Sequence, residues 1–353
     1  MRNKKFFIDG SKLMHHLPTV TKWIQGEQIY PIHVEISPSS GCNHRCVLCC
    51  VDYKRHKPQN LSEEVMKRLS DDLKEASVKS FLLAGEGEPL LNKYCVDLIK
   101  RSTQNGIDSS LTTNGVLFTQ DISKEILGDL SWMRFSIQAS TPKLYSKLHG
   151  TSERDFEKVK ENVRRATELK KKNNLETKIG IQQIIINENW DDVLGLAKLS
   201  KELGVDYFTV KRFSKHPNNT YDVPEDLHEK SALQFKEAEK LTDDSFMSIV
   251  RWNQFKEQPR EYKNCLGLPF ITQILASGEI YPCCQFFDTP ERSFGDLNVK
   301  TFKEIFDSER TKFIMKDIQE NYDVSKCMSY CRHHSTNIFL SNLKDSPEHV
   351  NFI

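Results

Sequence analysis

The feature that most constrains this chain is a group of three cysteines, Cys42, Cys46 and Cys49, within eight residues. They follow the segment 33–36, whose alternation of polar and apolar residues predicts a strand. Three thiolates at this spacing can hold three irons of a [4Fe–4S] cluster and leave the fourth iron open to a small molecule. A zinc site normally needs a fourth protein ligand, which this loop does not clearly supply. Three buried, unligated cysteines are the competing interpretation, and their tight clustering argues against it.

Composition excludes several other classes of protein. A chain of 353 residues can form one large domain and a smaller one. Its 50 basic and 49 acidic residues leave no charge excess that would attract nucleic acid. No secretory segment and no apolar run of membrane-spanning length is visible. We therefore expect a cytoplasmic protein in a reducing compartment, without a nucleic-acid or membrane partner.

Beyond the cysteines, strand and helix patterns alternate, which predicts an α/β protein with parallel strands and right-handed crossovers. This pattern suits either an open doubly wound sheet or a partial barrel, and periodicity alone does not choose between them. The predicted strands are 33–36, 81–84, 109–113, 133–138, 179–186 and 207–210, and the predicted helices are 61–76, 94–104, 123–130, 156–172 and 191–203.

Unusual residues follow the predicted strands at the end where both architectures place their chemistry. The cysteine loop follows the first strand, and Gly85 to Pro89 follows the second. Thr113-Asn114-Gly115, Ser136-Ile137-Gln138, Asn187-Glu188-Asn189 and Lys211-Arg212 follow the next four. The agreement of six separate segments predicts one site at that end of the sheet.

The cysteine run resembles the signature of the radical S-adenosylmethionine (radical SAM) superfamily. That resemblance implies a partial (β/α)6 TIM-type barrel and a [4Fe–4S] cluster whose open iron binds S-adenosylmethionine. It also implies reductive cleavage of that cofactor to a 5′-deoxyadenosyl radical, and therefore a reducing partner such as flavodoxin or ferredoxin.

The resemblance also assigns cofactor-binding roles to residues at the strand ends. Gly87 and Glu88, with Pro89, match the motif that contacts the methionyl ammonium, although Glu86 stands where the family has a first glycine. Leu48 takes the place of an aromatic residue near adenine and keeps only the apolar contact. The list of candidates is completed by Ser136 and Gln138, which match the polar pair that meets the ribose and carboxylate, and by Asn114, whose position before Gly115 equally suits a left-handed turn.

A second group of thiols lies near the C-terminus. Cys265, Cys283, Cys327 and Cys331 can supply four ligands to a cluster, with zinc and unligated cysteines as the alternatives. The layout over about 265–335 resembles the auxiliary-cluster extensions called SPASM and Twitch. Five thiols are too few for two clusters, so we predict one auxiliary [4Fe–4S] cluster in a small C-terminal SPASM/Twitch-like domain. The doublet Cys283-Cys284 leaves open which of the two binds iron.

These features predict four regions. They are an N-terminal extension (1–30), a radical SAM barrel (31–215), a bridging segment (216–264) that contains a further strand near 246–250, and an auxiliary-cluster domain (265–353).

Two thiols and two cations remain as further candidates. Cys50 and Cys284 are spare thiols beside presumed ligands, and either can give a hydrogen atom to a substrate radical or be a buried apolar residue. Lys211 and Arg212 are tentative substrate ligands, of which at most one faces the cavity, because adjacent strand residues point in opposite directions. His333, His334 and His349 are expected at the surface.

Relatives with one Twitch-type cluster often modify sugars or aminocyclitols, whereas maturases of peptides more often carry two auxiliary clusters. We therefore predict a radical SAM oxidoreductase or epimerase that acts on a carbohydrate-type small molecule, such as a nucleotide sugar. Maturation of a ribosomal peptide or protein is the second hypothesis. A non-catalytic metal-binding scaffold is a third, and it leaves the six strand-end segments unexplained.

Overall fold

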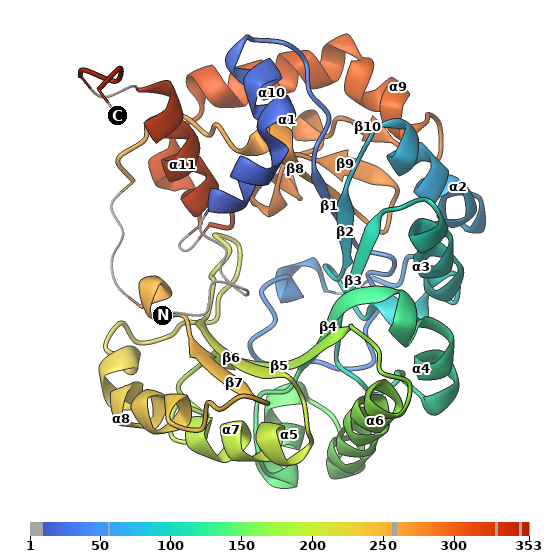
Figure 1. Cartoon of the computed structure of the whole chain (residues 1–353), viewed down its shortest axis with the longest axis vertical. Coiled ribbons are helices and arrows are strands. Elements are labelled where there is room, and N and C mark those ends of the chain that lie inside the picture. Colours follow the sequence, from blue (N-terminus) through green and yellow to red (C-terminus); the bar gives the residue numbers. More distant parts are fainter. Residues whose placement is uncertain (1–9, 56, 256–259, 329–330, 346–347, 353) are drawn as a thin grey trace.

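A computed structural model of the chain describes residues 10–55, 57–255, 260–328, 331–345 and 348–352. Its strands form a single curved sheet with helices on its convex side, and we call its concave side the lumen (Figure 1). The partial barrel that the family resemblance implied is therefore correct, and the open doubly wound sheet is excluded.

Seven parallel strands make up the barrel wall, in the order in which they occur along the chain. They are β1 (His33–Ile36), β2 (Ser80–Leu83), β3 (Asp108–Thr113), β4 (Leu130–Ser136), β5 (Lys178–Ile185), β6 (Tyr207–Arg212) and β7 (Met247–Val250). All six predicted strands are present, and β7 is the strand expected near 246–250.

The outer layer consists of helices that alternate with these strands. They are α2 (Glu63–Glu75), α3 (Cys95–Gln104), α4 (Gln120–Ile126), α5 (Pro142–His149), α6 (Glu153–Lys172), α7 (Val193–Glu202) and α8 (Leu227–Glu239). Helix α5 was not predicted separately, and α4 ends earlier than expected because β4 already begins at Leu130.

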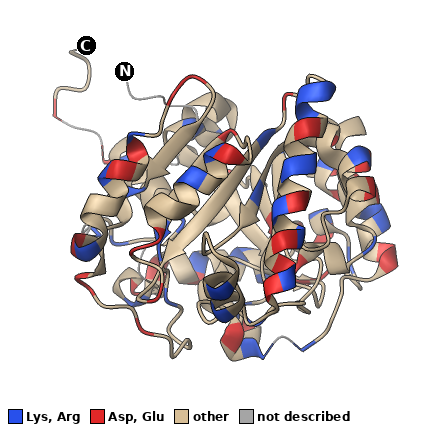
Figure 2. Ribbon diagram, turned by 90° about the horizontal axis from the view of Figure 1, so that it is seen from below, with Lys and Arg blue, Asp and Glu red and all other residues tan. Residues whose placement is uncertain are grey.

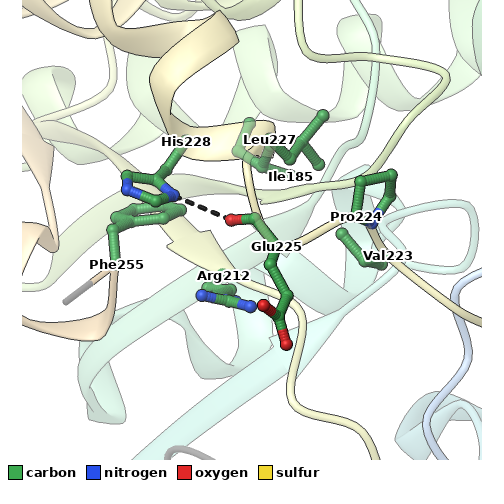
Figure 3. A pocket seen from close by; sticks show the side chains of 8 residues that line it. All are labelled: Ile185, Arg212, Val223, Pro224, Glu225, Leu227, His228 and Phe255. Atoms are coloured by element: carbon green, nitrogen blue, oxygen red, sulfur yellow. Dashed lines mark hydrogen bonds between the residues drawn. The ribbon is translucent and has the colours of Figure 1, made fainter. Parts of the chain in front are cut away.

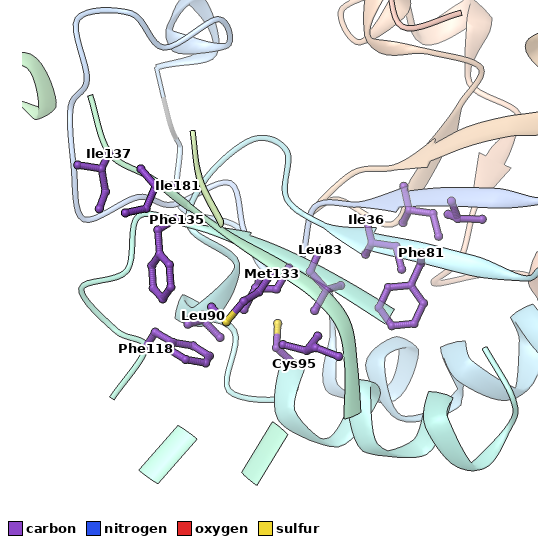
Figure 4. Close-up of a cluster of buried hydrophobic side chains, with 14 of the residues drawn as sticks. Ile36, Phe81, Leu83, Leu90, Cys95, Phe118, Met133, Phe135, Ile137 and Ile181 are labelled. Atoms are coloured by element: carbon purple, nitrogen blue, oxygen red, sulfur yellow. The ribbon is translucent and has the colours of Figure 1, made fainter. Parts of the chain in front are cut away.

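The side chains of the wall alternate between two faces, as the period of a strand requires. On β4, Met133 and Phe135 are fully buried and pack outward toward the helices, near Leu83 and Phe118 (Figure 4). The intervening residues of β4, including Arg134 and Ser136, are only partly buried and face the lumen. The core therefore lies between the sheet and the helices, and the lumen is left to polar groups.

The sheet extends past both limits predicted for the barrel. Helix α8 and β7 continue the parallel series into the segment 216–264. On the other side, β8 (Ile271–Ile274) pairs in parallel with β1, and β9 (Glu279–Tyr281) and β10 (Gly295–Asp296) continue antiparallel. The C-terminal region is thus joined to the barrel by main-chain hydrogen bonds, and the ends of the sheet bring distant thiols toward one lumen.

The last two helices are α10 (Glu309–Asn321) and α11 (His334–Lys344), and the N-terminal helix α1 (Leu17–Ile24) lies beside α11 in Figure 1. Val20 of α1 shares a small apolar cluster with Phe270 and Leu340. The first 30 residues therefore help to cover the C-terminal region. A short helix, α9 (Phe302–Asp307), packs against α2.

Charges of both signs alternate along the helices of the outer layer (Figure 2). Such mixing agrees with the near-zero net charge of +1. Within the described residues, no helix is both long and apolar enough to cross a bilayer.

Candidate active site

The three cysteines of the first group lie together in the loop that follows β1. Burial and, after it, the charge of the neighbouring Cys42 raise the pKa of Cys46 to about 12. Burial also raises the pKa of Cys49, and both Cys46 and Cys42 add to that shift. Thiols with such high pKa values are protonated at neutral pH unless a metal ion stabilises the thiolates. The three thiols of this loop can therefore bind a metal cluster, because the cluster's irons would stabilise their thiolate forms.

The backbone of this loop is fixed by the C-terminal end of α5. The N–H groups of Arg45 and Val47 donate to the carbonyls of His149 and Leu148 at 2.9 and 3.0 Å. Gly150 ends α5 with φ of +58°, and a Cβ on it would lie 2.3 Å from the Arg45 carbonyl oxygen. Glycine is thus required there by both its conformation and the closeness of the loop.

The loop after β2 packs directly on the start of the cysteine loop. A Cβ on Gly87 would lie 2.0 Å from the Gly41 carbonyl oxygen, and the Glu88 N–H donates to this same oxygen at 2.9 Å. The Glu88 carboxylate is buried and accepts hydrogen bonds from the Thr113 hydroxyl at 2.6 Å and the Asn114 N–H at 2.8 Å. Burial raises its pKa, and these hydrogen bonds oppose the rise. Glu88 therefore joins three strand-end loops beside the cysteines.

Glu86, which departs from the family motif, joins the barrel to the C-terminal region. One of its oxygens lies 2.6 Å from the Lys54 ammonium, and the other accepts from the Ala276 N–H at 2.9 Å. Lys54 belongs to the end of the cysteine loop and Ala276 to the turn between β8 and β9. The Glu86 carboxylate therefore has one partner in the cysteine loop and another in the C-terminal region.

The other predicted cofactor ligands also lie at this end of the barrel. Asn114 donates to the Asn43 side chain at 2.6 Å, and Gly115, with φ of +85°, makes the left-handed turn that we had considered for Asn114. Gln138 is buried and accepts the Ile184 N–H at 2.7 Å, so its side chain ties β4 to β5. Ser136 faces the lumen, and Leu48 is buried in the main core.

The C-terminal thiols line one common pocket. Cys265, Cys283, Cys284, Cys327 and Cys331 all border it, together with Met328 and Tyr322. Burial is the main cause of the raised pKa of each of these five thiols. Cys331 is a further cause for the other four. These donors fit one cluster with four thiolate ligands and one thiol to spare.

Side chains from other segments hold this pocket in shape. Arg260 donates to the carbonyls of Val324, Cys327 and Met328. The Asn337 amide donates to the Cys265 sulfur at 3.5 Å. We expected His333 at the surface, and this was wrong: it is 3% exposed and borders the pocket, because α11 packs over it.

The two spare thiols lie close enough for their charges to interact. Cys284 is the member of the doublet whose pKa is affected by Cys50, and both thiols affect the pKa of Lys211. Cys50 is reached by solvent, and the protein atoms around its sulfur still raise its pKa by burial. The structure thus brings Cys50, Cys284 and Lys211 together.

Lys211 and Arg212 diverge, as adjacent strand residues must. Lys211 points into the lumen. Arg212 lines a separate small pocket with Ile185, Glu225 and Phe255, beside the start of α8 (Figure 3). Of the two tentative substrate ligands, only Lys211 therefore lies with the other site residues.

The sequence analysis did not predict two further cations on the concave side of the sheet. Arg134 on β4 and Arg251, directly after β7, both lower the pKa of Lys211 through their charge, although burial is the larger cause. The alternation of apolar and polar residues along β4 was the one feature of the sequence that could have indicated that Arg134 faces the lumen. Arg251 follows a strand that we had placed outside the barrel.

His44, Cys46 and His149 place three possible metal-binding atoms within 4.8 Å of one another. They do not form a separate metal site, because Cys46 belongs to the first cysteine group and one His149 nitrogen already accepts a backbone hydrogen bond.

Taken together, a parallel-strand barrel with three thiols at its mouth and a second thiol pocket beside it defines a protein with two iron–sulfur clusters. Comparison with known sequences identifies both parts. Residues 36–200 match the radical SAM superfamily, and residues 265–333 match the iron–sulfur cluster-binding domain called SPASM. The chain is therefore a radical SAM protein with a C-terminal auxiliary-cluster domain. Its cofactors are a [4Fe–4S] cluster that binds S-adenosylmethionine, that cofactor itself and an auxiliary cluster.

Individual proteins resemble this chain more distantly. A "Tungsten-containing aldehyde ferredoxin oxidoreductase cofactor-modifying protein" of Pyrococcus furiosus is 23% identical over 314 residues, 84% of this chain and 85% of the relative. A GTP 3′,8-cyclase of Desulforamulus reducens is 32% identical over 142 residues, which span 39% of this chain and only 43% of that enzyme. The crystal structure of Streptococcus suis SuiB bound to S-adenosylmethionine shares the fold with a TM-score of 0.66 at 16% identity, covering 90% of this chain and 75% of SuiB.

Proposed function

We propose that this radical SAM enzyme acts on a small anionic substrate bound in the barrel lumen, with a phosphate-bearing or nucleotide-linked sugar as the leading class. When bound, the cluster and S-adenosylmethionine supply the radical that abstracts a hydrogen atom from the substrate. A reducing partner such as flavodoxin or ferredoxin is required. The observation that carries the proposal is the group of cations in the lumen, Lys211, Arg134 and Arg251.

These cations lie on β4, on β6 and directly after β7, and none of them has an ion-pair partner among the residues that the structure describes. Arg251 follows β7, and its N–H donates to the Val210 carbonyl at 3.1 Å, which places it beside Lys211 on β6. The Arg134 guanidinium donates to the Thr112 hydroxyl at 3.1 Å. Positive groups that face a common cavity repel one another, so an anion from outside would relieve the repulsion.

Unsatisfied polar atoms on the same wall support the proposal. The side-chain oxygens of Gln182 and Thr209, which are neighbours on β5 and β6, have no hydrogen-bond partner within the described part of the chain. The Arg134 Nε is also buried without a hydrogen-bond partner among the described residues. A buried polar group without a partner costs about 1–3 kcal/mol, so such groups point to a polar ligand or to bound water.

The thiols Cys50 and Cys284 are suited to return a hydrogen atom to the substrate carbon. In an epimerisation, an S–H bond would break, a C–H bond would form on the opposite face, and the resulting thiyl would need one electron and one proton to be restored. In a dehydrogenation, the substrate radical would instead lose a proton and give one electron to the auxiliary cluster, and no thiol would be consumed. Both thiols affect the pKa of Lys211, which supports a role for them beside the proposed substrate.

Maturation of a protein or of its cofactor is a second candidate. It is favoured by the Pyrococcus furiosus relative, whose name describes a cofactor-modifying protein and which aligns over most of both chains. The GTP 3′,8-cyclase is named for a phosphate-rich nucleotide, which favours the first candidate, although its alignment is partial.

The proposal can be tested with anaerobically reconstituted protein that contains about eight irons. Reduced protein should convert S-adenosylmethionine to 5′-deoxyadenosine, and the yield should rise with phosphorylated or nucleotide-linked sugars but not with their neutral analogues. Lys211→Met should abolish that rise and keep the basal cleavage. Stimulation by a protein or peptide alone would favour the second candidate. Zinc in place of iron, without any 5′-deoxyadenosine, would favour the scaffold.

Solvent deuterium separates the two outcomes on the substrate. Its incorporation at carbon implies a thiol donor and should disappear in Cys284→Ala or Cys50→Ala. A product two hydrogens lighter, without deuterium, implies dehydrogenation.

A further inference from the structure

The imidazole of His149 lies between the main chain of β4 and a ligand of the first cluster. His149 is the last residue of α5 and is 1% exposed. The N–H of Gln138 donates to its Nε2 at 3.2 Å. A nitrogen that accepts a hydrogen bond carries no proton, so the ring is neutral and its one proton is on Nδ1.

With its proton on Nδ1, the His149 ring points an N–H donor at the cysteine loop. The His149 Nδ1 lies 3.5 Å from the Cys46 Sγ, within range of an N–H···S hydrogen bond. The other neutral tautomer would carry its proton on Nε2, facing the Gln138 N–H, and would turn a bare Nδ1 toward the sulfur. Two donors would then oppose each other, so the tautomer protonated on Nδ1 is the favourable one.

Neighbouring rings hold the imidazole in place. It stacks on Tyr145 with centroids 4.0 Å apart and planes 20° apart, and the His44 ring meets it edge-on at 5.2 Å. Neither His44 ring nitrogen nor the Tyr145 hydroxyl has a hydrogen-bond partner within the described residues. His149 is thus the ring of the three whose polar atoms are both engaged.

We infer that His149 is a positioning residue that sets the reduction potential of the S-adenosylmethionine-binding cluster through its Nδ1–H···Sγ hydrogen bond to Cys46. A donor on a ligating sulfur stabilises the more negative, reduced state, so it raises the potential. The His44 N–H makes a similar contact with the Cys42 sulfur at 3.5 Å, but a main-chain group cannot be removed by substitution. The inference depends on the cluster and not on the proposed substrate.

Substitution of His149 need not release the loop. The hydrogen bonds that fix Arg45 and Val47 come from the main-chain carbonyls of His149 and Leu148. Variants at this position can therefore keep the loop anchored and still lose the side-chain donor.

The test is an anaerobic redox titration followed by electron paramagnetic resonance, using the signal that S-adenosylmethionine alters to distinguish this cluster from the auxiliary one. His149→Leu should make the cluster about tenfold harder to reduce, which corresponds to about 59 mV for one electron. His149→Asn places an amide donor near the position of Nδ1 and should restore the wild-type potential. Tyr145→Phe keeps the stacked ring and removes only a hydroxyl, so it should leave the potential unchanged.

An unchanged potential in His149→Leu with a full iron content would overturn the inference. If that variant does not bind iron, the comparison of His149→Asn with His149→Gln tests the inference instead. The Asn amide lies near the position of Nδ1, whereas the Gln amide lies near the position of Nε2 and cannot donate to the Cys46 sulfur in the same way. Equal potentials in these two variants would also overturn it, whereas a higher potential in the Asn variant would support it. Basal 5′-deoxyadenosine formation with a limiting reductant should follow the same order. Loss of the proposed substrate's effect alone would leave these values unmoved.

Discussion

The close approach of Gly87 to the cysteine loop yields a sharp prediction for Gly87→Ala. The new Cβ would lie 2.0 Å from the Gly41 carbonyl oxygen and 2.7 Å from its carbonyl carbon. Both are main-chain atoms, so no change of rotamer can relieve the overlap. One of the two loops must move, and Cys42 follows Gly41 directly.

The size of the effect follows from three contributions. Steric overlap in a packed site typically costs about 1–3 kcal/mol. Loss of the 2.9 Å hydrogen bond from the Glu88 N–H to Gly41 adds about 1 kcal/mol. Restriction of the unfolded chain by alanine returns about 0.4–1 kcal/mol. We expect a net destabilisation of about 1–3 kcal/mol, concentrated at the cluster loop.

The assay compares three properties of Gly87→Ala with wild type after anaerobic reconstitution. These are the midpoint of urea unfolding, the iron content and the affinity for S-adenosylmethionine. We expect a lower midpoint, loss of up to half of the iron and weaker binding of S-adenosylmethionine. Gly128→Ala is the matched control, because its Cβ would meet only the Leu175 side chain, at 3.6 Å, and its change should stay within about 0.5 kcal/mol. If Gly87→Ala keeps all three wild-type values, the contact between the two loops does not hold the site.

Two further predictions concern charged groups. Burial and the neighbouring cations lower the pKa of Lys211 to about 8. Because lysine is charged only below its pKa, the affinity for inorganic pyrophosphate, measured by calorimetry, should fall as the pH rises through about 8. Lys211→Arg should keep this affinity at higher pH, since arginine stays charged. Glu86→Gln should lower the melting temperature, because a charge-assisted hydrogen bond to Lys54 worth about 1.5–3 kcal/mol is lost; a melting temperature equal to wild type would show that the link across the two regions carries no stability.

Much of the barrel was readable from the sequence because its signals are local. Each strand of the wall is a short apolar or alternating run, and β1 to β6 were all found. The limits of the barrel were harder to predict. Helix α8 and β7 lie in a polar stretch whose pairing with β6 depends on a contact between distant segments, which local periodicity does not encode.

The cysteines show the same division. The spacing of Cys42, Cys46 and Cys49 indicated a cluster because ligands that lie close in sequence must lie close in space. The ligand pattern of the second group depended on segments far apart, and the sequence left Cys283 and Cys284 undecided. The structure places both in the pocket of the C-terminal thiols, and Cys284 alone of the two also interacts with Cys50 and Lys211, so Cys283 as the ligand stays a prediction.

The amino-acid sequence by itself determined the class of chemistry, since the spacing of thiols and the order of strands are properties of short segments. Only the tertiary structure decided which side chains meet in the lumen. Curvature of the sheet brings Lys211, Arg134 and Arg251 near one another and leaves Arg212 in a separate pocket, and the packing of α5 sets His149 against Cys46. These juxtapositions arise from the closing of a sheet over residues distant in the chain, so no local pattern could have revealed them.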